Sequence, residues 1–335
     1  MNILFTCAGR RNYLIDYFKE ALCGTGLVIA ADASEHAPAL FEADKSYIVP
    51  NIDESNYIDV IIDIAVENKI NAIISLNDLE LPLLANNLDK IEKNGVRVLV
   101  SHSQVIDLCF DKWKTHQTLQ DWGLRSPKTY LSPDTAQKAI REGSLSFPLI
   151  LKPRFGTASI GITTVDNENE LSGAYEYITN ALSKSMLRSF KNEEGNILIQ
   201  EKITGTEYGL DVINDLEGNY VVTFIKEKLA MRAGETDRAV TRRNTVLESA
   251  GRKIGESLRH IGNLDCDAYI VQGEAYILEM NPRFGGGYPF THAAGVNLPA
   301  VILAWLNGDP VDRKWLDIKP NILSSKCDRL VSKQL

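Results

Sequence analysis

The chain has 335 residues and a formal net charge of −8, with 44% hydrophobic and 24% charged residues. This length accommodates two or three packed domains, and the composition is ordinary for a water-soluble globular protein. The negative charge argues against nucleic acid as the main partner, because binding along a phosphate backbone requires a basic surface. The five cysteines are odd in number and show no CxxC spacing, so we expect reduced thiols in a cytoplasmic protein.

The sequence predicts neither export nor membrane insertion. The first apolar stretch, Asn2–Thr6, is short and enters a Gly-Arg-Arg turn, which indicates a first strand rather than a signal peptide. No uninterrupted apolar run approaches the length that spans a bilayer. We therefore expect no membrane among the partners of this protein.

The first hundred residues alternate short apolar strands with helical patterns. This alternation predicts a parallel sheet with helices on both faces. The expected strands are Ile3–Thr6, Leu27–Ala31, Tyr47–Val49, Ala72–Leu76 and Val96–Val100, with helices such as Tyr13–Leu22 and Tyr57–Asn68 between them.

The turn after the first strand, Cys7–Asn12, places one glycine and two arginines at a helix start, which suits an anion. It lacks the GxGxxG pattern of dinucleotide-binding folds. Asp32, at the end of the second strand, would be the ribose-binding acid of such a fold. Without the glycines we interpret Asp32 as an ordinary strand-end aspartate, and we do not expect a dinucleotide-dependent oxidoreductase.

A second unit begins with a helical region, Ser103–Trp122, and continues into a hairpin. Strand Leu149–Lys152 leads through a loop with glycine and serine to strand Ile162–Val165, and a helix follows over Glu170–Leu182. The tip of such a hairpin can bring backbone N–H groups over phosphates. Lys152 lies in an apolar run, where a lysine is costly unless it is paired, and an anionic phosphate is its natural partner.

From residue 197 onward the pattern is antiparallel, interrupted by a helix at Gly251–His260. A parallel α/β unit is thus followed by an α+β unit. The expected strands are Ile197–Glu201, Tyr208–Ile213, Tyr220–Met231, Cys266–Val271 and Ala275–Met280.

The most informative motif, Glu279-Met280-Asn281-Pro282-Arg283, closes the last of these strands. Side chains two apart on a strand face the same way, so Glu279 and Asn281 can share one cation. Asp267, on the neighbouring strand, could join them. Arg283 follows with a fork of donors that suits phosphate or carboxylate. Hard oxygen ligands beside such an arginine indicate Mg²⁺-nucleotide chemistry, with a surface salt-bridge patch as the alternative.

In their order and spacing these features resemble the ATP-grasp superfamily, specifically its carbamoyl-phosphate-synthase-like and carboxylate–amine ligase branch. The resemblance covers nearly the whole chain and includes the Gln200–Ile203 linker. It implies an α/β plus α+β protein in which a parallel pre-ATP-grasp domain precedes a two-subdomain ATP-grasp fold. The implied parts are the pre-ATP-grasp domain at 1–102, the lid subdomain with linker helices at 103–204 and the C-terminal catalytic subdomain at 205–335.

The same resemblance implies that ATP lies between the two grasping subdomains, under a mobile lid formed by Phe155–Gly161. The implied ATP-binding residues are Lys112, Lys152, Gly156, Ser159 and Gly161 at the phosphates, Glu201, Lys202 and Ile203 along the adenine, and Glu207 at the ribose. The implied ligands of Mg²⁺, or alternatively Mn²⁺, are Asp267, Glu279 and Asn281.

Further residues concern the reacting groups. By the resemblance, Arg283 would stabilise the transferring phosphoryl group together with Lys152. Arg232, just after a long strand, is expected to clamp a substrate carboxylate. The run Gly285–Gly287 would give a small substrate room to approach the backbone. Other polar residues fit a charged loop or a structural role as readily as a functional one: Arg238, Arg242, Arg243 and His292.

We therefore expect a ligase that uses Mg²⁺ and ATP to activate a small carboxylate, an amino acid in our interpretation, as an acyl phosphate for attack by an amine. Phosphoryl transfer needs charge neutralisation and alignment, and a reactive acyl phosphate needs a lid that excludes water. Activation of bicarbonate or carbamate and a non-catalytic nucleotide sensor are the alternatives. A homodimer paired through the first domain is what the resemblance implies for assembly.

Overall fold

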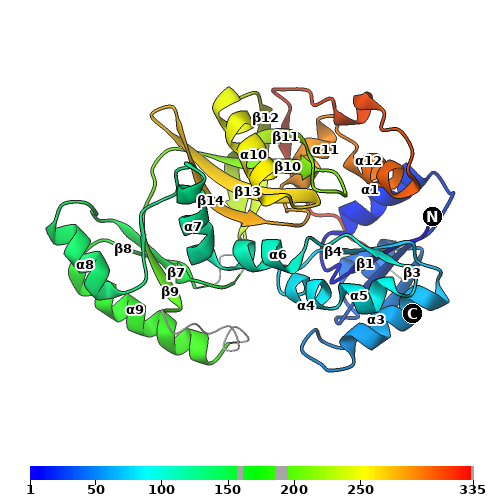
Figure 1. Ribbon diagram of the computed structural model, residues 1–335, viewed down its shortest axis with the longest axis horizontal. Helices are drawn as coiled ribbons and strands as arrows, with labels where there is room; N and C mark the ends of the chain where they lie inside the picture. The colour runs from blue at the N-terminus through cyan, green and yellow to red at the C-terminus, as the bar shows by residue number, and fades with distance from the viewer. Residues whose placement is uncertain (157–160, 186–194, 333–335) are drawn as a thin grey trace.

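The computed structural model describes residues 1–156, 161–185 and 195–332. They form three sheets, each with its own helices: an N-terminal unit, a projecting lid and a central sheet (Figure 1). The expected fold class, a parallel α/β unit followed by a two-part grasp, is confirmed.

The sheet of the N-terminal unit is parallel, with strand order β3-β2-β1-β4-β5. Its central strand β1 (Ile3–Thr6) is buried throughout, because helices cover both faces of the sheet. The other elements are β2 (Val28–Asp32), β3 (Lys45–Ile48), β4 (Ala72–Ser75), β5 (Arg97–Val98), α1 (Asn12–Leu22), α2 (Pro38–Glu42), α3 (Tyr57–Glu67), α4 (Leu81–Asn86) and α5 (Leu88–Glu92).

The lid is an antiparallel sheet of order β6-β9-β7-β8 covered by two helices. Its buried apolar residues, between 136 and 199, form a cluster separate from the other cores. Strand β9 pairs with both β6 and β7 in this sheet. The elements are β6 (Thr129–Tyr130), β7 (Leu149–Pro153), β8 (Thr163–Val165), β9 (Ile197–Glu201), α8 (Pro133–Arg141) and α9 (Glu168–Ser183).

The central sheet is antiparallel, with order β14-β13-β10-β11-β12-β15. The charged-loop alternative does not hold for Arg238 and Arg242: residues 235–242 form strand β12, paired with β11 and β15. The elements are β10 (Thr206–Asn214), β11 (Tyr220–Arg232), β12 (Glu235–Arg242), β13 (Gly262–Val271), β14 (Glu274–Asn281), β15 (Leu323–Ser325), α10 (Thr245–Leu258), α11 (Tyr288–Ala293), α12 (Leu298–Asn307) and the 3₁₀ helix η2 (Arg313–Leu316).

The expected helical region before the lid is two helices, α6 (Ser103–Phe110) and α7 (Lys112–Asp121). Asp111 separates them, and its side chain caps α7 by accepting from the N–H groups of Trp113 and Lys114. Both helices pack against β14 of the central sheet. The first residue of α7, Lys112, is therefore positioned by the central sheet, and the buried ion pair between Asp111 and Arg154 ties the same helix start to the end of β7.

One apolar core joins the N-terminal unit to the central sheet. Phe18 of α1 packs edge-on against Phe284, with ring centroids 6.3 Å apart, and both belong to one continuous buried cluster. Beside it, Tyr17 stacks on His292 at a centroid distance of 3.6 Å. Burial lowers the pKa of His292, so the structural interpretation of this histidine fits its surroundings.

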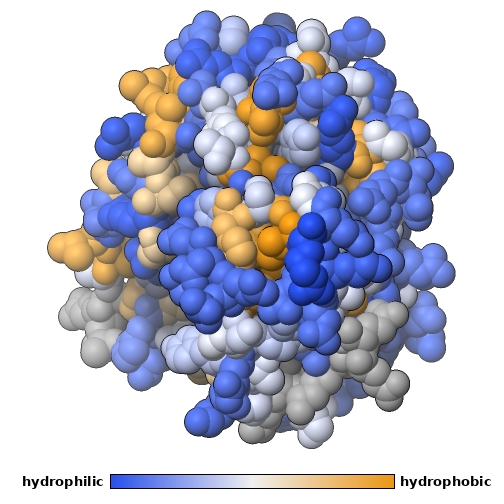
Figure 2. Space-filling view, turned by 90° about the vertical axis from the view of Figure 1, so that its left-hand side faces the viewer, coloured by the Kyte–Doolittle hydropathy of each residue, from blue (hydrophilic) through white to orange (hydrophobic). Residues whose placement is uncertain are grey.

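Seen from the lid end, the surface is mostly hydrophilic, with apolar residues showing in small groups (Figure 2). Within the parts of the chain that the structure describes, no helix is both long and apolar enough to cross a membrane.

A buried carboxylate organises the carboxyl ends of β1 and β4. Glu80 is fully buried and accepts hydrogen bonds from Thr6 Oγ1 at 2.9 Å, Ser75 Oγ at 2.6 Å and Tyr57 OH at 2.7 Å. Burial raises the pKa of Glu80, against the effect of these donors. The cluster fixes the loop between β4 and α4, which carries Asp78 to its ion pair with Arg283.

We predict that Glu80→Ala lowers the free energy of unfolding by roughly 3–5 kcal/mol, because it leaves three buried hydroxyls without an acceptor. Glu80→Gln should cost less, and it should also remove a pH dependence. Since the folded-state pKa of Glu80 is raised, its contribution is fully present below the ordinary value of 4.5 and is lost as the pH rises through the folded-state pKa. Urea unfolding at several pH values measures both effects, with exposed Glu217→Ala as the control. Equal effects of the Glu80 and Glu217 variants would contradict the assignment.

Candidate active site

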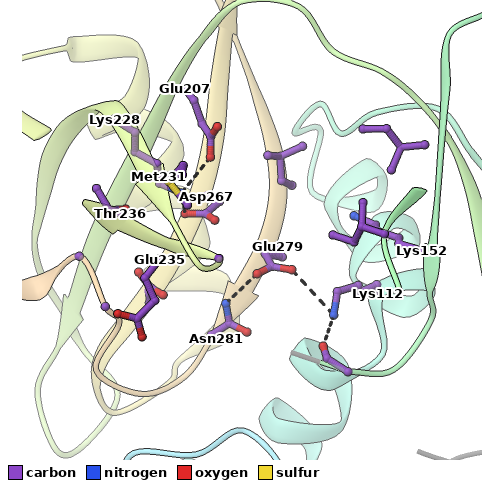
Figure 3. A pocket seen from close by; sticks show the side chains of 18 of the residues that line it. Lys112, Lys152, Glu207, Lys228, Met231, Glu235, Thr236, Asp267, Glu279 and Asn281 are labelled. Carbon is purple, nitrogen blue, oxygen red and sulfur yellow. Dashed lines mark hydrogen bonds and ion pairs between the residues drawn. The ribbon is translucent and has the colours of Figure 1, made fainter. Parts of the chain in front are cut away.

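A pocket of about 310 Å³ lies between the lid and the central sheet and reaches the N-terminal unit. Figure 3 shows side chains from the lid, from α7 and from the central sheet converging on it. Of the predicted site residues, those lining the pocket are Lys112, Lys152, Gly156, Glu201, Lys202, Ile203, Glu207, Asp267, Glu279, Asn281 and Arg283. Gly161 and Arg232 do not line it, and Ser159 lies outside the described residues.

Two lysines face the pocket from the lid side. Lys152 on β7 is only 8% exposed and makes no ion pair or hydrogen bond with the described residues. Burial lowers its pKa to about 8, although Glu279 raises it in part. Lys112 donates to the Gly156 carbonyl at 2.5 Å and lies 3.8 Å from Glu279 Oε2. Lys152 is thus a buried cation that still lacks an anion.

Oxygen ligands face these lysines from two paired strands. Asp267 lies opposite Glu279, and Asp265 lies opposite Asn281, in the antiparallel pairing of β13 and β14. Asn281 Nδ2 donates to Glu279 Oε1 at 3.3 Å, so these two side chains do share one face. No hydrogen bond from the described part of the chain reaches the other atom of that amide, Oδ1, which is therefore available as a ligand.

The donor set fits Mg²⁺ held jointly with a nucleotide. Among the described residues, no three His, Cys, Asp or Glu side chains gather closely enough to hold a metal by themselves. Mg²⁺ characteristically takes one or two carboxylates plus phosphate oxygens rather than an all-protein cage. Burial raises the pKa of Asp267 despite the opposing effect of Lys228, and Asp265 and Glu279 raise it further. A cation beside Asp267 and Glu279 would relieve this repulsion.

Lys228 is a site residue that the sequence analysis missed. It is buried between Glu207 Oε1 at 2.9 Å and Asp267 Oδ1 at 2.6 Å. Although burial lowers its pKa, Asp267 and Glu207 raise it well above the usual range, so the lysine stays charged. Tyr269 OH donates to the other oxygen of Glu207 at 3.0 Å. The sequence could have indicated this lysine, because Lys226 and Lys228 are two apart on β11 and therefore point to the same face of the strand.

Arg283 joins two parts of the protein. Its guanidinium donates to Asp78 at 2.8 Å, from the loop after β4, and to Asp265 at 2.9 Å, on β13. Burial lowers the pKa of Arg283, but Asp78 and Asp265 raise it by more. The net pKa therefore lies above the usual range and the side chain stays charged. The protein itself therefore supplies two carboxylates to this arginine.

One expectation about the substrate side needs correction. Arg232 is half-exposed at the turn between β11 and β12, and it pairs with Asp237 and Asp328, each at 2.9 Å, outside the pocket. In the run Gly285–Gly287, the last two glycines line the pocket, but close packing of neighbouring side chains also requires glycine here. A Cβ on Gly285 would lie 2.1 Å from Asp265 Cγ, and one on Gly287 would lie 2.6 Å from Lys226 Cε, so the glycines admit these side chains.

Two families match consecutive parts of the chain: PylC-like, N-terminal domain, over residues 3–99, and ATP-grasp domain, over residues 145–290. The arginine-specific carbamoyl phosphate synthase large chain of Bacillus subtilis is 22% identical over 65% of this chain and 21% of the relative. The carbamoyl phosphate synthase large chain of Clostridium acetobutylicum is 26% identical over 79% of this chain and 24% of the relative. The chain thus spans about a quarter or less of the length of these curated relatives.

Solved structures share the fold. The biotin carboxylase domain of Hydrogenobacter thermophilus 2-oxoglutarate carboxylase, in complex with MgADP, ADP and bicarbonate, has a TM-score of 0.76 at 19% identity, covering 96% of this chain and 73% of that one. For the L-amino acid ligase from Bacillus licheniformis the TM-score is 0.69 at 20% identity, covering 95% and 77%. With the two family matches in the expected order, the chain combines a PylC-like N-terminal domain with an ATP-grasp domain, and it is similar to the carbamoyl phosphate synthase large chain.

Proposed function

We propose that this protein is an Mg²⁺- and ATP-dependent ligase that activates the carboxylate of an amino acid as an acyl phosphate and joins it to an amine. Lys152 is the observation that carries the proposal. It is 8% exposed and unpaired among the described residues, in the same pocket as Lys112, Glu279 and Asn281. An unpaired buried lysine is costly, and a phosphate would supply the missing charge.

In this proposal the phosphates of ATP lie between the two lysines and the oxygens of the central sheet, with the adenine along Glu201–Ile203 and the ribose near Glu207. Asp267, Glu279 and Asn281 would hold Mg²⁺, and Mn²⁺ suits the same oxygen ligands. When bound, the ion neutralises charge on the phosphates and aligns them. The lysines bind and orient the phosphoryl group.

The reaction proceeds by two displacements. A carboxylate oxygen attacks the γ-phosphorus, the bond to ADP breaks, and an acyl phosphate forms. The amine nitrogen then attacks the acyl carbon, phosphate leaves, and the nitrogen loses a proton to give the amide. The chain contributes charge, alignment and exclusion of water. A lid with its own core, connected through residues 202–205, suits hinged closure over the pocket.

We also propose the three-part division at residues 1–102, 103–204 and 205–335, with α6 and α7 as linker helices. A homodimer through the N-terminal unit is part of this proposal, supported by the unpaired edge strand β3, where Ile48 is 58% exposed. All five cysteines are free, which fits a reducing compartment such as the cytoplasm.

The first experiment measures ADP release from Mg²⁺-ATP across amino acids and small carboxylates, each with and without ammonia or a second amino acid. Release that requires both a carboxylate and an amine supports the ligase. Bicarbonate, which is bound in the similar biotin carboxylase structure, is the second candidate, and stimulation by bicarbonate alone would favour it. Tight ATP binding without release in any mixture would point to a nucleotide sensor.

We predict that Glu279→Gln reduces ADP release at least about 100-fold without changing the far-ultraviolet circular dichroism spectrum, because it removes a charge expected to bind the metal. Arg283→Ala should also abolish release, with a loss of stability because Asp78 and Asp265 lose their partner. Exposed Glu217→Gln is the matched control. Turnover that persists in Glu279→Gln would refute the role assigned to this residue.

Lys152→Met should weaken ATP binding and yet stabilise the unliganded protein. Burial lowers the pKa of Lys152 from 10.5 to about 8, so below pH 8 the protonated side chain carries a penalty of about 3 kcal/mol. We expect the free energy of unfolding at pH 7 to rise by about 1–3 kcal/mol in this variant. The wild type should gain stability between pH 8 and 10.5, where the unfolded chain binds the extra proton.

Urea unfolding at pH 7 and pH 9.5, together with calorimetric titration of ATP, tests this prediction. Lys93→Met, at an exposed helix end, is the control and should change neither property. A Lys152→Met protein that binds ATP normally and is less stable than the wild type would show that Lys152 is structural.

A further inference from the structure

The end of the pocket away from the lysines carries charges that the nucleotide does not account for. Figure 3 shows Glu235 on the opposite side of Glu279 and Asn281 from Lys112 and Lys152. We call this part of the pocket the substrate end. The residues that line it are Arg11, Met231, Gly234, Glu235, Thr236 and Gly286.

Arg11 is the uncompensated cation of the substrate end. It follows β1 and directly precedes α1, and its Nη1 donates to the backbone carbonyls of Leu76 at 2.9 Å and Phe284 at 2.6 Å. No carboxylate in the described ranges pairs with it. The Phe284 carbonyl also accepts from Arg283 at 3.3 Å, so the two guanidinium groups are neighbours. Arg283 has two carboxylate partners, whereas Arg11 keeps its charge for a ligand.

Two buried donors at this end also lack acceptors. Arg283 Nε and Tyr13 OH make no hydrogen bond with the described residues. Tyr13 is close enough to Arg11, Glu235 and Arg283 for each to affect its pKa, which burial raises. Buried donors without acceptors are rare and costly in proteins. Because Arg283 lines the pocket, an anionic group bound near Arg11 would give the Nε of Arg283 an acceptor.

Glu235 supplies the opposite charge. It opens β12, and its Oε2 accepts from Lys326 at 3.0 Å, while no hydrogen bond from the described residues reaches Oε1. The carboxylate packs against Gly286, where a Cβ would come within 2.9 Å of it. Burial raises the pKa of Glu235, but Lys326, Arg11 and Arg283 lower it overall, so the group is ionised near neutral pH. It can therefore accept an ammonium group.

We propose that the substrate end binds the zwitterionic head of a free α-amino acid, with its carboxylate on Arg11 and its ammonium group on Glu235. The inference rests on the ligase proposed above and specifies how it selects its substrate. A carboxylate ligand without an amino group would bring a second anion near Glu235 and leave Glu235 without a cationic partner. A simple amine would leave Arg11 without an anionic partner. Bicarbonate has no cationic group to place on Glu235. In this arrangement Arg283 is a positioning residue, because Asp78 and Asp265 already hold it.

The test begins with the amino acid that gives the fastest ADP release. Arg11→Gln should raise its KM roughly 10- to 100-fold and leave the KM for ATP within about twofold, because a charge-assisted contact is lost only at the substrate end. The KM of Arg11→Lys for the amino acid should lie between those of the wild type and Arg11→Gln. Arg10→Gln, the same change at the exposed neighbouring residue, should leave both KM values unchanged. An equal rise in both KM values for Arg11→Gln would show a structural role and overturn the proposal.

Glu235→Gln separates recognition of the amino group from recognition of the carboxylate. This variant should raise the KM for the amino acid roughly 10-fold or more. Its KM for the corresponding carboxylic acid that lacks the amino group should stay unchanged. Wild-type protein that uses the two acids equally well would overturn the proposal.

Calorimetric titration of the twenty common amino acids, in the presence of a non-hydrolysable ATP analogue and Mg²⁺, distinguishes this inference from the ligase proposal. Binding that Arg11→Gln abolishes supports the inference even where no ADP forms, in which case only the ligase proposal fails. ADP formation with unchanged binding in Arg11→Gln overturns the inference and leaves the ligase proposal standing. Absence of binding by every amino acid overturns the inference.

Discussion

The site depends on one buried arginine held between two carboxylates. Arg283 connects Asp78 of the N-terminal unit to Asp265 on β13, at 2.8 and 2.9 Å. Asp265 lies opposite Asn281 in the strand pairing, so the same contact fixes the strand end that carries the candidate metal ligands. A buried ion pair of this kind adds little net stability but is costly to break, by about 3–5 kcal/mol. Its main effect is geometric, because it aligns the N-terminal unit with the pocket.

Charge is separated across the pocket in a way that favours a phosphate-bearing ligand. The lid contributes Lys152, which has no counter-ion among the residues that the structure describes, while the central sheet contributes Asp267, Glu279 and the amide of Asn281. Lys112 belongs to the central side, since α7 packs on β14, yet it reaches the lid at Gly156. Because the lid has its own apolar core, Lys152 can move with the lid as one body. Closure of the lid onto the central sheet is therefore electrostatically most favourable when an anion and a metal ion lie between them.

The sequence predicted the nucleotide side of this site better than the substrate side, for a physical reason. A lysine inside an apolar strand, and two oxygen ligands two residues apart before a proline, are local patterns set by the period of a strand. The partners of Arg283 are not local: Asp78 lies 205 residues away in the chain. Strand β12 was missed because its charged and apolar residues show no clear alternation, and only pairing with β11 and β15 makes it a strand. Arg232 and Arg11 are both arginines in turns, and only the fold shows which one keeps an unpaired charge in the pocket.

The nucleotide side of the pocket comes from local patterns and the substrate end from distant segments, and this difference affects how substrate selectivity arises. The candidate metal ligands belong to adjacent strands and keep their spacing wherever those strands pair. The substrate end is assembled from Arg11 of the N-terminal unit and Glu235 of the central sheet, and the C-terminal segment reaches it through Lys326. The apolar core shared by α1 and Phe284 holds the first two contributors in register. Substitution of Arg11 or Glu235 would therefore alter which head group fits without disturbing the strands that hold the nucleotide, so substrate choice can change while the phosphate chemistry is retained.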